Sequence, residues 1–256
     1  VAIHPLYGRP SPFVLAEYVE MESGTGLVHT APGHGLEDFE TALRYDLPVI
    51  SPVDDLGRFT AEAGEALVGK VVDQANDTVI GLLDEAGALL GAGKIEHEYP
   101  HCWRCHLPVI YRATKQWFFS IDHRDLRAQM KRVVDETTWL PPEGKNRIGS
   151  MIALRPDWCI SRQRLWGVAI PVFFCESCEE PLCTPETIAK VATLVGEYGS
   201  DVWFARDVSD LLPEGIRCGK CGGETFRKER DILDVWFDSG VSHLAVLPHY
   251  AHLSWP

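Results

Sequence analysis

The 256-residue sequence has no apolar run of about 18 residues, the length that a membrane-spanning helix needs. Its first residues contain no basic stretch followed by an apolar one, so an intact secretory signal is not expected. Internal repeats and low-complexity tracts are absent as well. With 45% hydrophobic residues, the chain has the composition of a globular protein and the length for one large domain or two ordinary ones.

The sequence is also short of positive charge. Its net charge is −13, whereas nucleic-acid binders usually present a basic surface. Residues 104–164 differ from the rest, because 12 Lys and Arg stand there against 6 Asp and Glu. This excess predicts a local surface for phosphate groups, or it is only a chance feature of a solvated face.

Eight cysteines are present, and most of them form Cys-x-x-Cys pairs. Without a secretory signal, such pairs indicate metal ligands in a reducing compartment rather than disulfides. Two pairs, 39 residues apart, predict a closed tetrahedral zinc site of structural type. The predicted ligands are Cys175, Cys178, Cys218 and Cys221. Reduced structural cysteines are the alternative, and Cys183 could compete as a ligand. Cys102 and Cys105 would supply half of a second site.

Sequence periodicity predicts a mixture of helices and strands. Runs of β-forming residues bounded by Gly or Pro predict strands at 13–20 and 26–30, and an aromatic-rich stretch predicts two buried strands within 102–121. Apolar residues at three-to-four spacing predict helices. The predicted helices cover 36–47, 74–83, 122–136, 145–154 and 185–195.

The most informative stretch is residues 24–38, GTGLVHTAPGHGLED. Its small residues let a ligand approach the backbone closely. His29 leaves the end of the apolar segment, and Asp38 lies in the first turn of the predicted helix, where the helix dipole favours an ionised carboxylate. Such a carboxylate is a suitable partner for an ammonium group. The alternatives are that Asp38 only caps the helix and that His29 is an ordinary core residue.

Two further stretches carry chemistry. Residues 155–171 read RPDWCISRQRLWGVAIP and combine arginines with two tryptophans, a set that suits phosphate contact and aromatic packing. The candidates for phosphate contact are Arg155, Arg162 and Arg164. In the alternative interpretation these are surface charges and the tryptophans are core anchors. Residues 234–240 read DVWFDSG, and a buried strand that ends in a turn is their purely structural interpretation.

These three stretches, in this order, resemble the isoleucyl-tRNA synthetase family of class I synthetases. The resemblance implies that Asp38 holds the amino group of a misattached amino acid. It also implies that His29 orients the ester for attack by water, beside the backbone of Gly24, Thr25 and Gly26.

The resemblance implies further that Trp236 and Asp238 line the amino-acid pocket. The parent protein would ligate isoleucine to tRNA(Ile) with ATP and Mg, and hydrolyse valyl-tRNA(Ile) at a separate editing site. One missing methylene discriminates too weakly for binding alone, a limit for which this family is the standard example. We expect a monomeric, cytoplasmic parent without membrane contact.

The implied fold is an α/β and α+β mixture in four parts. They are the C-terminal part of a β-barrel-like editing domain at 1–101, the re-entry into a Rossmann-type catalytic core with a helical insertion at 102–173, a zinc-binding insertion at 174–230 and a further core segment at 231–256. The His-Ile-Gly-His and Lys-Met-Ser-Lys-Ser motifs that bind ATP are absent, as is the threonine-rich strand of the editing pocket. We therefore expect an internal part of a longer enzyme that does not activate an amino acid by itself.

Other families and classes remain as alternatives. A valyl-tRNA synthetase is the nearest, but its motif usually lacks a histidine at the place of His29, and the leucyl enzyme departs further around residues 30–35. A non-catalytic, zinc-containing RNA-binding module is the alternative from another class. A free-standing editing hydrolase is disfavoured, because half of the editing pocket would be missing.

Overall fold

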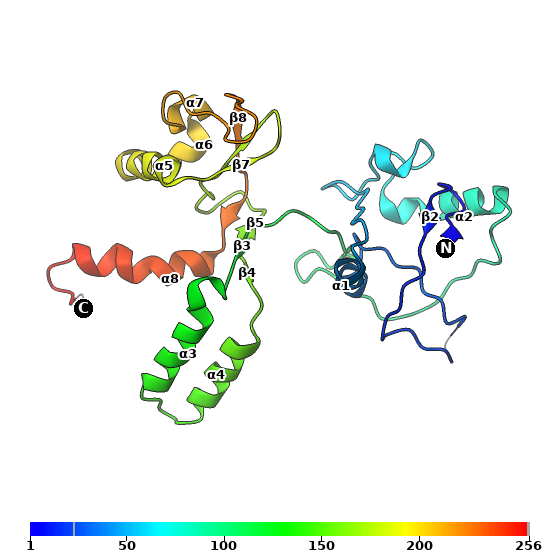
Figure 1. Cartoon of the computed structure of the whole chain (residues 1–256), viewed down its shortest axis with the longest axis horizontal. Coiled ribbons are helices and arrows are strands. Elements are labelled where there is room, and N and C mark those ends of the chain that lie inside the picture. Colours follow the sequence, from blue (N-terminus) through cyan, green and yellow to red (C-terminus); the bar gives the residue numbers. More distant parts are fainter. Residues whose placement is uncertain (23, 255–256) are drawn as a thin grey trace. The chain divides into compact units, whose positions relative to one another are not determined.

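The computed structural model describes residues 1–22 and 24–254, and the chain divides into two compact units, Val1–Lys115 and Gln116–Pro256. Helices and short strands occur in both units, which confirms the predicted α and β mixture (Figure 1). Within the described ranges, every helix is too short or too polar to cross a membrane.

The first unit extends to Lys115. Arg112 donates to the backbone oxygen of Asp54 over 2.8 Å and forms an ion pair with Asp55. The backbone N–H of Ala113 donates to the carbonyl of Gly33 over 2.7 Å. These contacts attach the segment up to Lys115 to the first unit.

The first unit has few regular elements. They are β1 (Ala2–Ile3), β2 (Pro10–Ser11), α1 (Leu36–Tyr45), α2 (Asn76–Glu85) and the short 3-10 turns Ala61–Ala63 and Val72–Gln74. β1 and β2 pair antiparallel. The helices predicted at 36–47 and 74–83 are confirmed within two residues, because their apolar spacing is a local signal. α1 ends where Asp46 adopts a left-handed conformation with φ 52°.

The strands predicted at 13–20 and 26–30 are wrong, since both segments are irregular. A strand needs a neighbour to receive its backbone hydrogen bonds, and no described strand pairs with either segment. Their apolar side chains are correspondingly exposed, as at Leu15 (83%) and Leu27 (66%). The described residues therefore contain no closed barrel of the kind expected for 1–101.

The second unit contains three small sheets. They are β3 (Phe118–Phe119) with β4 (Trp158–Cys159), β5 (Ser161–Arg162) with β9 (Ile232–Leu233), and a three-stranded sheet in the order β7 (Pro181–Leu182), β6 (Phe173–Cys175), β8 (Phe226–Lys228). All these pairs are antiparallel, so the described strands form no parallel Rossmann sheet. The two buried strands predicted within 102–121 are wrong, because only β3 forms and both its side chains are exposed.

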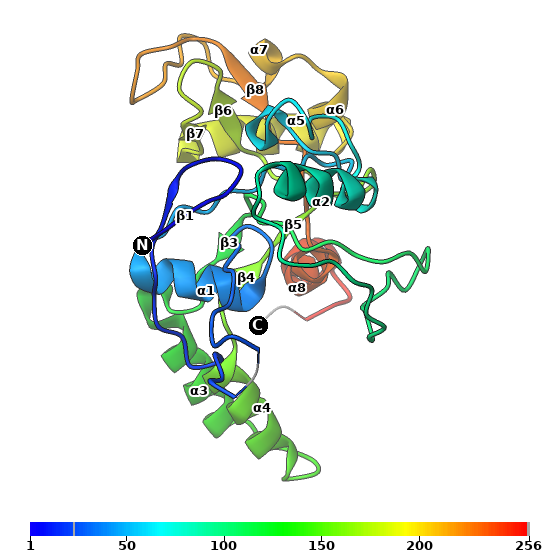
Figure 2. The same cartoon turned by 90° about the vertical axis from the view of Figure 1, so that its right-hand side faces the viewer.

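The helices of the second unit are α3 (Leu126–Glu136), α4 (Gly144–Leu154), α5 (Pro185–Tyr198), α6 (Val202–Ala205), α7 (Val208–Leu211) and α8 (Val235–Val246). The predictions at 145–154 and 185–195 are confirmed. The helix predicted from residue 122 begins only at Leu126, because Arg124 and Asp125 have positive φ. α3 and α4 lie side by side in both views (Figures 1 and 2).

The main core of the second unit lies between the β7-β6-β8 sheet and α5–α7. Phe173 is fully buried on β6, and its ring lies 5.0 Å from that of Trp203 on α6. α5 starts at a capping box in which Thr184 and Thr187 exchange hydrogen bonds. This core holds β6 and β8, the strands that lead to the cysteine pairs.

Candidate functional site

The loop that precedes α1 is fixed at three places. A Cβ on Gly33 would lie 2.1 Å from the backbone oxygen of Ile50, so only glycine permits this close approach. The Gly33 carbonyl accepts from the N–H of Ala113 over 2.7 Å, and the Nδ1 of His34 donates to the carbonyl of Tyr111 over 2.9 Å. The position of the α1 N-terminus is therefore set by contacts with distant parts of the first unit.

Asp38 lies half-buried in the first turn of α1. Its Oδ2 lies so close to Gly35 that a Cβ there would be 2.7 Å away. Gly35 is the N-cap residue of α1, and no side-chain capping hydrogen bond forms there. Among the residues that the structure describes, none forms a hydrogen bond or an ion pair with the Asp38 carboxylate. The carboxylate is thus free to bind a cation at the positive end of the helix.

His29 lies in the irregular segment before this loop and is exposed, so it is not a core residue. Burial lowers the pKa of the nearby His4, with smaller contributions from the charges of Arg9 and His29. Gly24 and Gly26 have positive φ values of 62° and 69°. Between these two glycines, the hydroxyl of Thr25 accepts from the N–H of Leu27 over 3.3 Å, and this bond closes the turn.

Gly33→Ala is expected to loosen the loop before α1. The new Cβ would meet the backbone oxygen of Ile50 at 2.1 Å, so one of the two segments must move. Overpacking of this kind costs about 1–3 kcal/mol, and hydrogen exchange of peptides covering residues 30–52 should become faster. Gly81→Ala on α2 is the control, because its Cβ meets nothing within 4 Å and alanine favours a helix. Unchanged exchange in Gly33→Ala would contradict the expected clash.

The two predicted cysteine pairs come together in space. The sulfur atoms of Cys175, Cys178, Cys218 and Cys221 all lie within 4.8 Å of one another. Two of the separations are 3.5 Å and 3.6 Å. Four thiolates around one zinc ion at a Zn–S distance of about 2.3 Å would be about 3.8 Å apart. The four cysteines therefore form a candidate metal site with the dimensions of a tetrahedral thiolate site, and Cys183 lies outside it.

Both cysteine pairs are held in the same kind of tight turn. In the first turn, the N–H of Cys175 donates to the carbonyl of Glu180 over 3.0 Å. In the second turn, the N–H of Cys218 donates to the carbonyl of Gly223 over 2.8 Å. β6 leads into the first turn and β8 follows the second, so the pairing of β6 with β8 brings the two turns together.

The thiols of this site favour different protonation states. Backbone N–H groups of Cys221 and Lys220 lower the pKa of Cys218 to about 7. The backbone N–H of Glu180 also favours a thiolate at Cys178, but burial and the three neighbouring sulfurs outweigh it and raise the pKa of Cys178 to about 12. Four thiolates cannot be crowded together without a cation, and a bound divalent metal supplies that charge.

Cys102 and Cys105 form a third turn of the same geometry in the first unit. The N–H of Cys102 donates to the carbonyl of Leu107 over 2.8 Å. The residue after the second cysteine has positive φ in all three turns, with 59° at His106, 57° at Glu179 and 73° at Gly222. Backbone N–H groups of Cys105 and Arg104 lower the pKa of Cys102. This turn has the form of a metal-binding half-site.

The three arginines of residues 155–171 have different surroundings. Arg162 points inward and forms an ion pair with Asp234, and it also donates to the carbonyl of Cys159 over 2.8 Å. Arg155 and Arg164 are exposed, and neither side chain has a hydrogen-bonding or ionic partner in the part of the chain that the structure describes. These two side chains are therefore free of internal partners, whereas Arg162 is engaged by Asp234.

Asp234 is a key residue that the sequence interpretation missed. It is 4% exposed, and its carboxylate meets Arg162, the indole N–H of Trp158 and the N–H of Trp236. An aspartate directly before an apolar run is the usual signal of a helix N-cap, and that signal was present. The alternative interpretation of residues 234–240 as a buried strand is accordingly wrong, because α8 begins at Val235.

Trp236 and Asp238 both project from the first turns of α8. Trp236 is 72% exposed, which is unusual for the largest apolar side chain and typical of a contact surface. Burial, followed by the charge of Asp234, raises the pKa of Asp238. The N-terminal end of α8 thus carries an exposed indole at Trp236 and, two residues later, the carboxyl group of Asp238.

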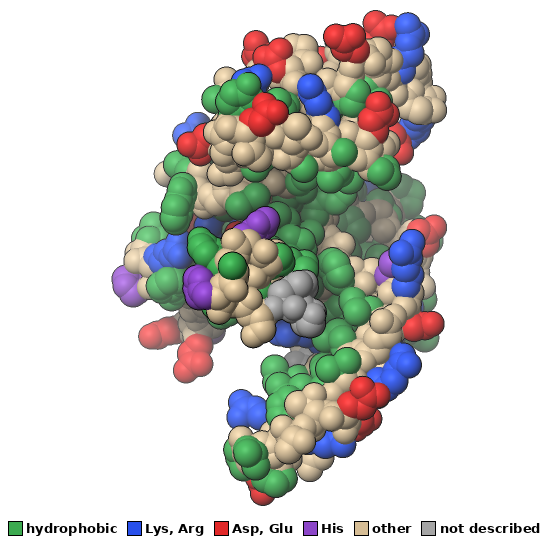
Figure 3. Space-filling model, turned by 90° about the vertical axis from the view of Figure 1, so that its left-hand side faces the viewer, with side chains coloured by type: hydrophobic (Ala, Val, Ile, Leu, Met, Phe, Trp, Pro, Cys, Tyr) green, Lys and Arg blue, Asp and Glu red, His purple; other side chains and the backbone are tan. Residues whose placement is uncertain are grey.

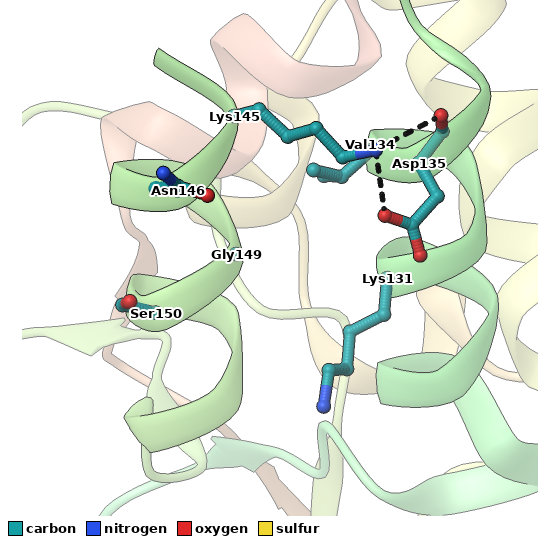
Figure 4. A pocket seen from close by; sticks show the side chains of 7 residues that line it. All are labelled: Lys131, Val134, Asp135, Lys145, Asn146, Gly149 and Ser150. Carbon is teal, nitrogen blue, oxygen red and sulfur yellow. Dashed lines mark hydrogen bonds and ion pairs between the residues drawn. The ribbon is translucent and has the colours of Figure 1, made fainter. Parts of the chain in front are cut away.

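A cavity of about 360 Å³ lies between α3 and α4. Lys145 of α4 reaches across to Asp135 of α3 over 3.0 Å, while the Lys131 side chain points away from this pair (Figure 4). Acidic and basic side chains are interspersed over the face drawn in Figure 3. On that face, the Lys and Arg side chains do not gather into one basic patch.

Comparison with known proteins adds to this geometry. Residues 15–254 match the family of tRNA synthetases class I (I, L, M and V). The chain is 55% identical to the isoleucine–tRNA ligase of Syntrophomonas wolfei over 253 residues, which are 99% of this chain and 27% of that protein. It is 51% identical over 256 residues to the ligase of Moorella thermoacetica and 53% identical over 259 residues to that of Carboxydothermus hydrogenoformans, covering all of this chain and 27% and 28% of those proteins.

The chain thus spans about 27% of the length of the curated relatives that it matches. The family match covers nearly the whole chain, and residues 155–171 and 234–240 of the second unit lie inside it. On this basis, the chain belongs to the class I tRNA synthetases of the I, L, M and V group.

Proposed function

We propose that this chain is part of an isoleucine–tRNA ligase, which attaches isoleucine to tRNA(Ile) with ATP and Mg. The observation that carries the proposal is the identity of 51–55% over 99–100% of the chain to proteins of that name. The catalytic segment would contribute Trp236 and Asp238 to the amino-acid pocket, where the exposed indole packs against the aliphatic side chain of isoleucine. The exposed Arg155 and Arg164 would meet tRNA phosphates, whereas Arg162 serves inside the protein.

The first unit would belong to the editing domain, where misattached valine is removed. Asp38 binds the α-ammonium group of the valyl ester, because its carboxylate is half-buried, without a partner and at a helix N-terminus. His29 orients the ester, and the backbone of residues 24–26 lines the pocket. A water molecule then attacks the ester carbonyl and releases valine and the free tRNA. The anchored loop before α1 supports this role, since it holds the carboxylate in one place.

The four-cysteine site would hold one structural zinc ion. Its sulfur separations and the shared turn geometry support zinc, and a closed set of four thiolates leaves no position for a reacting group. Cys102 and Cys105 would be half of a second zinc site, completed by cysteines outside this chain. The metal supplies folding free energy rather than chemistry.

Trp236→Ala in the complete ligase is the test of the amino-acid pocket. We expect the KM for isoleucine in ATP–pyrophosphate exchange to rise about tenfold or more, because losing the contact of a large apolar side chain costs about 1.5 kcal/mol or more. Phe204→Ala, an exposed aromatic residue of α6, is the matched control and should leave the KM unchanged. An enzyme that activates valine in preference to isoleucine would support the valyl alternative. Absence of any exchange activity would favour the non-catalytic, zinc-containing RNA-binding module.

A further inference from the structure

A single buried carboxylate joins the two sequence motifs of the second unit. The Oδ2 of Asp234 accepts a hydrogen bond from the indole N–H of Trp158 over 3.1 Å and forms the ion pair with Arg162. These partners lie 76 and 72 residues earlier in the chain, on β4 and β5. One side chain therefore connects the segment 155–171 to the segment 234–240.

Backbone hydrogen bonds also hold Asp234 in place. The N–H of Asp234 donates to the carbonyl of Ile160 over 2.8 Å, and the N–H of Leu233 donates to the carbonyl of Val168 over 2.7 Å. Arg162 is itself held, because its guanidinium also donates to the carbonyls of Cys159 and Ser161. The start of α8 is thus attached by backbone hydrogen bonds to the paired strands β5 and β9.

The other oxygen of the carboxylate sets the direction of the helix. Oδ1 of Asp234 accepts from the N–H of Trp236 over 3.0 Å, which makes Asp234 the N-cap of α8. The ring of Trp158 lies 6.4 Å from that of Phe237 and packs against the same turn. Trp236 itself is 72% exposed, so its own packing does not hold it. Its location depends on where the helix begins.

We propose that Asp234 is a positioning residue for isoleucine binding, which acts by tying the first turn of α8 to Arg162 and Trp158 and so places Trp236 and Asp238. This inference rests on the proposed function of those two residues. Asp234 does not touch the substrate. Its two oxygens have separate tasks, since one caps the helix and the other connects it to β4 and β5.

Asp234→Asn separates these tasks. Asparagine retains one oxygen, so it can cap α8 or accept from Arg162 and Trp158, but its amide NH₂ group cannot accept at the other place. We expect the KM for isoleucine of the complete ligase to rise about tenfold, because small misplacement of a binding group has effects of that size or larger. The KM for ATP should change less than about twofold. A ¹⁹F resonance of 5-fluorotryptophan at position 236, assigned with Trp236→Phe, should shift.

Arg162→Gln and the double variant complete the test. Arg162→Gln leaves the buried carboxylate without its cation and should raise the KM for isoleucine to a similar extent. In the double variant with Asp234→Asn, the KM for isoleucine should rise by less than the two single effects combined. The reason is that neither the carboxylate nor the guanidinium is then left without its partner. Asp207→Asn is the control, since Asp207 precedes α7, is exposed and forms no side-chain capping bond.

The outcomes separate the inference from the proposed function. If Trp236→Ala raises the KM for isoleucine and Asp234→Asn does not, the positioning role is refuted and the pocket stands. A lower thermal midpoint for Asp234→Asn with an unmoved ¹⁹F resonance and unchanged KM would show a merely structural role. If neither variant changes the KM for isoleucine, the pocket assignment itself fails.

Discussion

Asp38→Ala is expected to slow the hydrolysis of valyl-tRNA(Ile) by the complete ligase about 10- to 100-fold. The carboxylate at the start of α1 has no partner among the described residues, and the proposed partner is the ammonium group of the valyl ester. Hydrogen bonds to charged groups contribute about 1.5–3 kcal/mol, which converts to that range of rates. The rate is measured with radiolabelled valyl-tRNA(Ile) under single-turnover conditions. Charging with isoleucine should be unaffected, because the proposed function assigns it to another site.

Two neighbouring substitutions sharpen this experiment. Glu37→Gln removes a carboxylate from the same helical turn, but Glu37 is exposed, so deacylation should continue at the normal rate. Asp38→Asn keeps the size of the side chain and removes only its charge. Its deacylation rate should be nearly as low as that of Asp38→Ala. If Asp38→Ala deacylates valyl-tRNA(Ile) as fast as the unsubstituted enzyme, the editing assignment for this unit is refuted. The RNA-binding module is then the favoured alternative.

Cys218→Ser is expected to abolish metal binding at the four-cysteine site and to unfold the part of the second unit around it. The unchanged chain should carry about one zinc ion by elemental analysis. Cys218 is 5% exposed within the core that contains β6 and α5, so loss of the metal leaves the neighbouring thiols crowded and uncompensated. Metal binding in such sites supplies folding free energy directly, so hydrogen exchange across residues 172–228 should become much faster.

Cys183→Ser is the matched control for this prediction. Cys183 is exposed and lies outside the cluster, so its loss should leave both zinc content and hydrogen exchange unchanged. Cys102→Ser should also leave the zinc content of this chain unchanged, because a half-site alone binds metal weakly. A chain that is purified without metal and yet shows full protection at residues 172–228 would contradict the zinc assignment.

Local signals in the sequence predicted the elements that depend on neighbouring residues. The apolar spacing of Leu36 to Leu47 predicted α1, and a helix was likewise predicted over 185–195, where α5 lies. The strands predicted in the first unit do not form, because a strand depends on residues that are not its sequence neighbours. Residues 13–20 have strand-forming side chains, but a strand is completed only by a partner that lies elsewhere in the chain, and no described segment takes that place.

By itself, the sequence determined the family and the composition of the candidate metal site. The motif at 155–171 and each Cys-x-x-Cys pair are continuous stretches of sequence, so their chemistry can be recognised without coordinates. Only the tertiary structure showed that Arg162 forms an ion pair with Asp234. It alone showed that the Cys102 turn repeats the geometry of the other two. Spacing along the chain encodes turns and helix faces, whereas the partner of a buried charge is set by packing between segments more than 70 residues apart.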